Sequence, residues 1–200
     1  MLDVEGLHDR IRKLYQEYED AVAQLKKDAL CKPGCSFCCT EVGAVGVTTL
    51  EALVPRKAML IMGSRKQKRL KKAIRQNRRE MSHGGTARCP FPDGEQACMV
   101  YEARPFSCRR LYSVRECRPR GATMRRPAVE FAARIVRRIQ EVDDTGYSGH
   151  LAHILHPLDD PAFRKTYLSG AYHPERIAPY GRSHGIVINR VVAGDGGGKG

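Results

Sequence analysis

The chain has 200 residues and a formal net charge of +13, because 35 lysines and arginines stand against 22 acids. A chain of this length can bury a hydrophobic core without disulfides, which excludes the small disulfide-stapled secreted scaffolds. Tryptophan is absent and phenylalanine is scarce, which argues against a single-stranded nucleic-acid surface built on stacked aromatic side chains.

The opening residues are acidic and amphipathic, and they lack the basic start, apolar run and small-residue cleavage site of a signal peptide. No stretch approaches the roughly 20 apolar residues that span a bilayer. We therefore expect a cytoplasmic protein without a membrane span. Thiols stay reduced in the cytoplasm, so clustered cysteines there bind metal more often than one another.

An amphipathic helix is predicted over residues 3–29, and residues 1–30 are taken as an N-terminal unit. Its apolar side chains recur at steps of three and four: Leu7, Ile11, Leu14, Tyr18, Val22 and Leu25. A turn at 32–34 follows, and residues 41–49 alternate valine with small residues, which predicts a short extended stretch. Thr48 and Glu51 form a capping box for a second helix over 50–62, with a kink near Pro55.

A third helix is expected from Arg65 to about Met81, capped by Ser64 and ended by His83-Gly84-Gly85. It has one narrow apolar stripe: Leu70, Ala73, Ile74 and Met81. The rest of its surface is strongly basic: Arg65, Lys66, Lys68, Arg69, Lys71, Lys72, Arg75, Arg78 and Arg79. Such a field attracts an acidic protein, a nucleic acid or anionic lipid, although it can also be a solvated face that keeps the protein soluble.

The second half of the chain begins with an irregular segment, 86–126, whose order needs another source such as metal ligation. A helix then starts at Pro127, with one apolar face: Val129, Ala132, Ile135, Val136, Ile139 and Val142. Short helices are expected near 148–155 and 161–169, and residues 185–192 read as a strand or an apolar docking segment. Residues 193–200 form a glycine-rich tail that we expect to be disordered.

Eight cysteines in two groups are the main functional signal. The first group is Cys31, Cys35, Cys38 and Cys39. Two residues separate Cys35 from Cys38, so a tight turn can aim both sulfurs at one ion, and Gly34 permits the backbone to fold close to it. The side chains of adjacent Cys38 and Cys39 tend to diverge. The doublet therefore fits a multi-metal cluster, or one ligand beside a packed or redox-active thiol, more easily than one tetrahedral ion.

The second group is Cys89, Cys98, Cys108 and Cys117, and it contains no pair separated by two residues. Each of these cysteines would arrive from a different loop. Together with the first group they can complete one closed site, which is the arrangement we favour, although eight thiolates can also serve two sites. Free structural thiols and a disulfide framework are the alternatives to metal ligation.

These motifs resemble the YkgJ family of CxxCxxCC-type zinc- or iron-chelating proteins, of which flagellin lysine N-methylase (FliB) is a relative. The resemblance covers residues 31–117 and rests on three motifs: Cys35, Cys38 and Cys39; Cys89-Pro90-Phe91; and Cys98 to Cys108-Arg109 with Tyr101, Glu102, Arg104 and Pro105. The family has two residues between its first two cysteines, whereas Cys31 and Cys35 are separated by three.

The resemblance implies a domain, residues 31–192, that binds zinc or iron through the eight cysteines, with a [4Fe–4S] cluster as one form of the iron. It also leaves open S-adenosylmethionine-dependent methyl transfer to a protein lysine, or a closed zinc site beside a basic helix, 65–79, that binds nucleic acid or an acidic partner. No catalytic residue is identified from the sequence. The predicted fold is mainly α-helical, with an irregular cysteine-ligated centre and little β structure.

Other polar residues offer weaker signals. Arg104 can lower the pKa of nearby thiols and donate to sulfur, or it can form a structural ion pair with Glu102. His150, His153 and His156 are three apart and two of them can share a helical face, but Pro157 closes the segment and histidines at helix ends are common.

Overall fold

The computed structural model describes residues 1–32, 34–42, 45–82, 88–93, 97–118 and 120–194. The protein is mainly helical, with 63% helix and a small three-stranded antiparallel sheet, which confirms the predicted fold class. Within the described ranges, none of the helices is long and apolar enough to cross a membrane.

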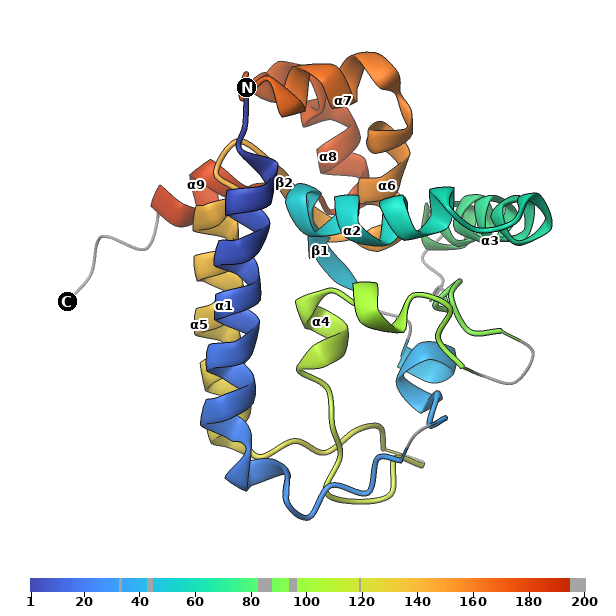
Figure 1. Ribbon diagram of the computed structural model, residues 1–200, viewed down its shortest axis with the longest axis vertical. Coiled ribbons are helices and arrows are strands. Elements are labelled where there is room, and N and C mark those ends of the chain that lie inside the picture. The colour runs from blue at the N-terminus through green and yellow to red at the C-terminus, as the bar shows by residue number, and fades with distance from the viewer. Residues whose placement is uncertain (33, 43–44, 83–87, 94–96, 119, 195–200) are drawn as a thin grey trace.

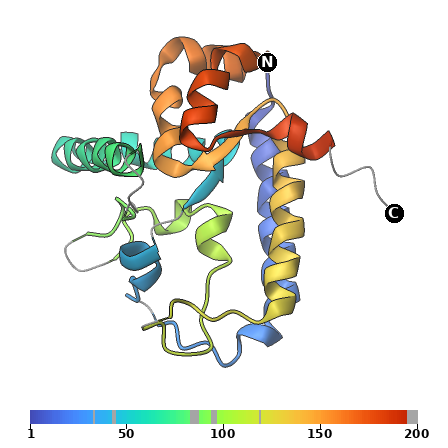
Figure 2. The ribbon, with the colours of Figure 1, turned by 180° about the vertical axis from the view of Figure 1, so that it is seen from behind.

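Helices α1 (Val4–Val22) and α5 (Arg126–Val142) lie side by side and run in opposite directions (Figures 1 and 2). The predicted apolar stripe of α1 is confirmed, because Ile11, Leu14, Tyr18 and Val22 are buried. Burying side chains of this size stabilises the fold by about 1.5–3 kcal/mol each. The α-helix ends earlier than predicted, at Val22, and a 3₁₀ turn, η1 (Gln24–Lys26), follows it.

The apolar face predicted for α5 is partly wrong. Val129 and Val136 are 45% and 36% exposed. The predicted Ala132, Ile135, Ile139 and Val142 do pack into the core with α1, together with Ala128, which was not predicted. Each residue turns an α-helix by about 100°, so a residue next to this stripe is rotated to its solvent edge.

Strand β1 (Gly46–Thr48) and helix α2 (Thr49–Leu60) confirm the extended stretch and the capping box. The Thr48 side chain accepts from the Glu51 amide at 3.2 Å, and Glu51 Oε2 accepts from the Thr48 amide at 3.0 Å. Pro55 lies inside α2.

The sheet has the order β1-β2-β3, formed with β2 (Tyr147–His150) and β3 (Val187–Ile188). The helix predicted at 148–155 is therefore wrong over its first three residues, because 148–150 pair with β1 and α6 (Leu151–Asp159) begins after them. The single strand predicted at 185–192 is also wrong in part, because α9 (Asn189–Gly194) follows the two residues of β3.

A second hydrophobic core lies among α2, α3 (Ser64–Ser82), α6, α7 (Pro161–Leu168) and α8 (Ala178–His184). Helix α3 buries Leu70 and Ile74 as predicted, and Asn77, whose amide donates to the Arg88 carbonyl at 2.6 Å. The helix predicted at 161–169 is confirmed by α7. Helix α8 and the 3₁₀ turn η4 (Pro174–Arg176) were not predicted. The predicted stop at 83–85 and residues 195–200 of the predicted tail lie outside the described residues.

The cysteine-bearing segments lie below the sheet in Figure 1, between the α1–α5 pair and α3. Where the structure describes these segments, their helical elements are short: a π-helical turn, η2 (Cys38–Val42), a 3₁₀ turn, η3 (Tyr101–Ala103), and α4 (Phe106–Arg109). These turns are too short to produce a sustained apolar period, so the sequence predicted an irregular segment there.

Candidate metal centre

The first cysteine segment is a series of turns that follows η1. Gly34 has a φ of 85°, a conformation that residues with a side chain rarely adopt. The Cys39 amide donates to the Ser36 carbonyl at 2.8 Å, which begins the turn that carries the cysteine doublet. The Leu30 amide donates to the Ser113 carbonyl at 2.8 Å. This bond joins the first segment to the loop that bears Cys117.

The later cysteines arrive from three separate supports. An isolated β-bridge pairs Pro92 with Cys98, and α4 carries Cys108. The Ser113 hydroxyl stabilises the third support, the Cys117 loop, by accepting from the Thr123 amide at 2.9 Å and donating to the Arg115 carbonyl at 2.6 Å. The prediction that each of these cysteines comes from a different loop is therefore right for Cys108 and Cys117, whereas Cys89 and Cys98 lie on the two sides of one bridged segment.

Helix α4 is held in place by the helices around it. Tyr18 of α1 is fully buried, meets the Phe106 ring edge-on at 5.0 Å between centroids, and donates its hydroxyl to the Arg110 carbonyl at 3.2 Å. The Phe106 amide donates to Glu51 Oε1 at 2.9 Å. Cys108 therefore lies on a helical turn fixed at both ends.

The thiols fall into two sets of neighbours. The first thiol group consists of Cys31, Cys35, Cys38 and Cys117, because the nearby thiols of the other three raise the pKa of Cys38. The second thiol group consists of Cys39, Cys89, Cys98 and Cys108. The Cys39 thiol raises the pKa of each of the other three, and Cys108 also raises the pKa of Cys89. The Cys39 thiol also raises the pKa of Cys38, so the two groups meet at the doublet. The sequence favoured a single site and left two sites open, and the number of sites stays a prediction.

Burial and hydrogen bonding set the protonation of these thiols. Burial, followed by the neighbouring thiols, raises the pKa of Cys38 to about 11. Burial likewise raises the pKa of Cys98, and that of Cys108 to about 12. A hydrogen bond with Cys89 lowers the pKa of Cys39 to about 7 and raises the pKa of Cys89.

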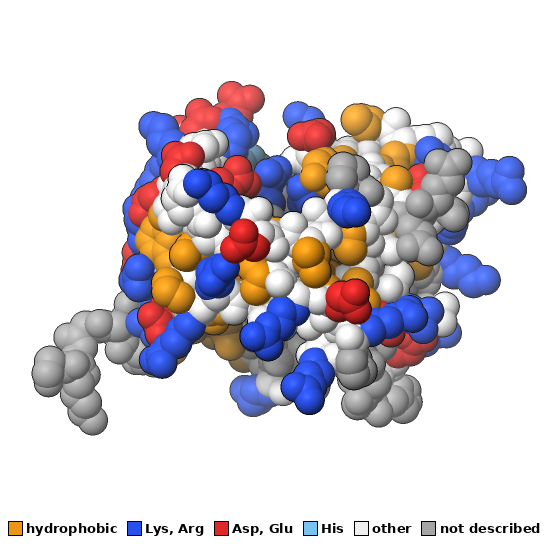
Figure 3. Space-filling model, turned by 90° about the horizontal axis from the view of Figure 1, so that it is seen from below, with side chains coloured by type: hydrophobic (Ala, Val, Ile, Leu, Met, Phe, Trp, Pro, Cys, Tyr) orange, Lys and Arg blue, Asp and Glu red, His pale blue; other side chains and the backbone are white. Residues whose placement is uncertain are grey.

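Arg104 is a positive charge common to the second thiol group, since it lowers the pKa of Cys39, Cys98 and Cys108. Its guanidinium lies 3.5 Å from the centroid of the Tyr101 ring, and its Nε donates to the Tyr101 carbonyl at 3.0 Å. The ion pair with Glu102 that the sequence offered as an alternative does not occur between these two described residues. Lys and Arg side chains are spread over the face that the cysteine-bearing loops form (Figure 3).

The donor set suits a thiophilic metal. All eight cysteines are free; Cys31 and Cys35 are exposed and the other six are partly buried. Clustered thiolates are the ligands that zinc, copper(I) and iron–sulfur clusters prefer. Among the described residues, no three side chains of His, Cys, Asp or Glu are placed to hold a metal ion. The cysteines are therefore neighbours of the right chemistry, and their sulfurs must converge further to coordinate an ion together.

The histidines considered in the sequence have structural contacts. His150 caps α6 by accepting from the Ala152 amide at 3.2 Å. His153 is buried beside Tyr180, whose hydroxyl lies 3.3 Å from His153 Nδ1, and its ring centroid is 4.6 Å from that of His184. Burial, followed by the neighbouring His184 and His150, lowers the pKa of His153 to about 4. A neutral, packed ring is the consequence.

Comparison with known families agrees with this donor set. Residues 30–128 match the model of a family described as CxxCxxCC, a putative zinc- or iron-chelating domain. The chain carries a CxxCxxCC domain. No curated protein and no solved structure matches the chain. The CxxCxxCC match confirms the predicted resemblance, and its range includes all eight cysteines, Cys31 and Cys117 among them.

Sequence reasoning missed the residues that hold the CxxCxxCC loops in place. Ser113 organises the Cys117 loop, and Glu51, recognised only as a helix cap, also accepts from the backbone of α4. Tyr18 was assigned to an apolar stripe, although its hydroxyl reaches the end of α4. A tyrosine in a buried stripe and a carboxylate beside it are weak signals, because their partners lie 55 and 92 residues away along the chain.

Proposed function

We propose that this protein binds zinc or iron at two separate centres, one at the first thiol group and one at the second. One observation carries the proposal: adjacent Cys38 and Cys39 have different thiol neighbours. Four thiolates complete either a tetrahedral zinc site or a [4Fe–4S] cluster. Two groups of four therefore account for every cysteine in the chain.

The proposed centres differ in how they are supported. The second thiol group lies on the β-bridge, on α4 and on the η2 turn, and Cys89 and Cys39 also share a backbone hydrogen bond of 2.8 Å. The first group lies on turns, and two of its thiols are exposed. Binding at the second group thus requires less rearrangement, and we expect it to be the tighter of the two.

Metal binding and folding are linked in such a site, because a ligand that binds only the ordered loops stabilises them. A bound ion would supply the cross-link that the irregular segments lack. The proposal requires thiols that stay reduced, as in the cytoplasmic location expected from the sequence.

The test is metal analysis of protein purified without oxygen. We expect two zinc ions, or two iron–sulfur clusters, per chain. A brown protein with acid-labile sulfide identifies clusters, and a colourless protein with zinc identifies ions. Cys38→Ser should lose one equivalent and keep the other, and Cys39→Ser should do the same.

The double variant C38S/C39S provides the matched control, because it should lose both equivalents. If either single substitution removes all the metal, the two groups form one centre. Metal-free, fully folded protein with four disulfides would overturn metal binding altogether.

A second function, binding of an acidic partner or nucleic acid, is favoured by α3. Among the described residues, its exposed Lys66, Lys68, Lys71, Lys72 and Arg75 form no ion pair with a carboxylate. We propose that this helix binds a polyanion by its charge. The test is binding of a DNA duplex and of an acidic peptide, compared with the variant K68Q/K71Q/K72Q. Affinity should fall steeply with salt for the native chain and with a smaller slope for the variant. No binding at about 50 mM salt contradicts this second proposal.

A further inference from the structure

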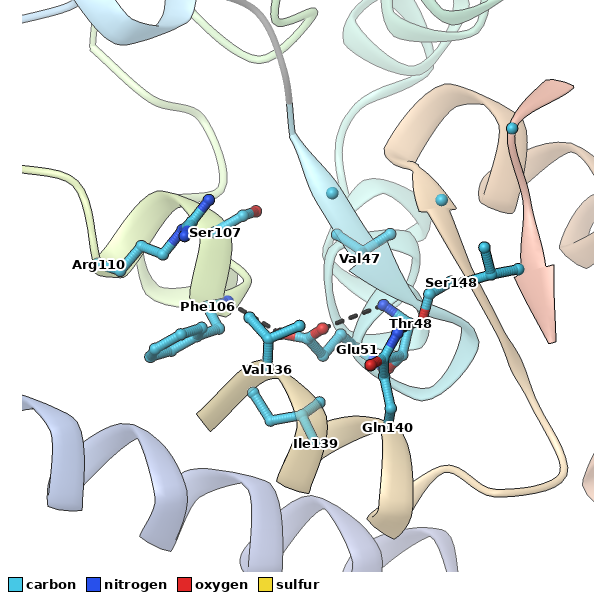
Figure 4. A pocket seen from close by; sticks show the side chains of 14 residues that line it. Val47, Thr48, Glu51, Phe106, Ser107, Arg110, Val136, Ile139, Gln140 and Ser148 are labelled. Atoms are coloured by element: carbon cyan, nitrogen blue, oxygen red, sulfur yellow. Dashed lines mark hydrogen bonds between the residues drawn. The ribbon is translucent and has the colours of Figure 1, made fainter. Parts of the chain in front are cut away.

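A cavity of about 260 Å³ lies between the sheet, α4 and α5 (Figure 4). Its volume is just below the range of about 300–1,000 Å³ that is usual for small-molecule sites, so it suits a small ligand. Val136 and Val187 line it and are 36% and 44% exposed. The cavity is therefore open to solvent beside these two side chains.

One wall of the cavity carries a partly buried cation without a partner. Ser107 and Arg110 lie there together, projecting from α4 and its end (Figure 4). Arg110 Nε is buried and has no hydrogen-bond partner, whereas the Ser107 hydroxyl, also buried, contacts the adjacent Cys108 thiol. Among the described residues, no carboxylate pairs with the Arg110 guanidinium. A partly buried cation without a partner is costly, and an anion bound beside it would offset that cost.

The carboxyl group in the cavity does not serve Arg110. Glu51 Oε1 accepts from the Tyr15 hydroxyl at 2.6 Å and from the Phe106 amide at 2.9 Å, and Oε2 accepts from the Thr48 amide. Burial raises the pKa of Glu51, which favours its neutral form. Both oxygens of Glu51 are therefore occupied by donors of the protein, and Glu51 belongs to the frame of the cavity.

The apolar side chains that line the cavity indicate the chemistry of the rest of the ligand. Val47, Val136 and Ile139 give the cavity an apolar wall across from Arg110. Small-molecule sites typically combine such an apolar lining with a few polar groups that fix orientation. The cavity therefore fits a molecule with one anionic end and a short apolar body.

We propose that this cavity binds a small carboxylic acid, with its carboxylate against Arg110 and Ser107 and its apolar body against Val47, Val136 and Ile139. A guanidinium binds a carboxylate through two parallel hydrogen bonds, which gives both affinity and orientation. Ser107 directly precedes Cys108 of the second thiol group, so a bound acid would lie beside the proposed metal centre without being one of its ligands.

The test is calorimetric titration of the full chain, with its native metal, by three carboxylates and by their neutral amides: 3-methylbutanoate, hexanoate and phenylacetate. At least one acid should bind, and its amide should bind roughly tenfold or more weakly. Arg110→Gln should weaken the acid by a similar factor and remove the preference over the amide. Val136→Phe should fill the cavity from its exposed edge and weaken both.

Arg137→Gln is the matched control, because Arg137 is exposed on α5 and does not line the cavity. It should bind as the native chain does, and circular dichroism should show that all variants keep the same helix content. The proposal is overturned if none of the three acids binds, or if R110Q and native protein bind them equally. Equal binding of acid and amide would also overturn it, since that outcome describes a purely apolar cavity.

Discussion

Among single residues, Arg104 has the clearest expected effect on the proposed metal centres. A divalent ion held by four thiolates leaves two negative charges, and a nearby cation offsets part of them. The charge of Arg104 lowers the pKa of three thiols of the second group. It is held over the Tyr101 ring and by the Tyr101 carbonyl, so its charge stays in place without a carboxylate partner.

We therefore predict that Arg104→Gln weakens metal binding at the second thiol group and leaves the first group unchanged. A loss of roughly tenfold in affinity is expected, which corresponds to about 1.4 kcal/mol. Competition with a chromophoric chelator in the C38S background, where only the second group should bind, measures this loss directly.

Arg120→Gln is the control for this prediction, because Arg120 is exposed and lies in the Cys117 loop. In the same background it should leave the affinity of the second group unaltered. Equal losses in the two variants would mean that the general positive charge of the loops, and not the position of Arg104, supports the metal.

Among the elements, Glu51 joins three helices at one point. It caps the start of α2 together with Thr48, and its carboxyl group accepts from Tyr15 of α1 and from the first amide of α4. Glu51 is only 5% exposed, so the donors that meet its carboxyl group are shielded from water. An amide left without an acceptor in such a place costs about 1–3 kcal/mol.

Glu51→Ala should therefore lower the free energy of unfolding by roughly 3 kcal/mol or more, because it strands the Thr48 and Phe106 amides and leaves a void. Tyr15→Phe removes one hydrogen bond and should cost only about 1 kcal/mol. Urea unfolding followed by circular dichroism measures both. The role of Glu51 as a junction is refuted if E51A is no more destabilising than Y15F.

For the molecule as a whole, the sequence predicted the features that depend on residues close together in the chain. The stripe of α1, the Thr48–Glu51 cap and the buried edge of α3 were all predicted, because each depends on residues close together in the chain. Strand β2 was missed because it has only four residues, and β3 was predicted as part of a longer segment because it has only two. Strand β2 pairs with β1 about 100 residues before it and with β3 about 40 residues after it, which no local pattern indicates.

The cysteine site divides in the same way. The sequence identified all eight cysteines and the family, because the motifs are local. It favoured one site and left two open, and the different partners of Cys38 and Cys39 support the proposal of two. The direction in which each thiol points depends on the π-helical turn at Cys38–Val42 and on loops joined by bonds such as Leu30 to Ser113. Such long-range contacts leave no period in the sequence.

Asp143 is the buried acid at which the parts of the fold meet. Its carboxylate oxygens accept from the Leu50 amide at 2.8 Å and from the Tyr167 hydroxyl at 2.7 Å, while its carbonyl accepts from Asn189 at 2.8 Å. It thus joins the end of α5 to α2, α7 and α9. Asp143 is only 2% exposed, and this burial raises its pKa to about 7.

This raised pKa predicts how stability changes with pH. Below about pH 4 both the folded and the unfolded chain keep the proton, so Asp143 imposes no penalty. As the pH rises, the unfolded chain releases the proton first, and folding loses about 1.4 kcal/mol per pH unit until the folded pKa is reached. Above about pH 7 the penalty is constant, on the order of 4 kcal/mol.

Asp143→Asn removes the titrating group. The free energy of unfolding of this variant, minus that of the native chain, should therefore rise by a few kcal/mol from about pH 4 to about pH 7. Urea unfolding at both pH values gives this difference, and any pH dependence from the cysteines or metal cancels in it. Asp144→Asn is the control, because Asp144 is exposed and its only described ion pair, with Arg190, spans 3.6 Å at the surface. Its difference from the native chain should stay within about 0.5 kcal/mol at both pH values. A pH-independent difference for D143N would show that Asp143 is ionised in the folded protein throughout, and that its two donors outweigh the effect of burial.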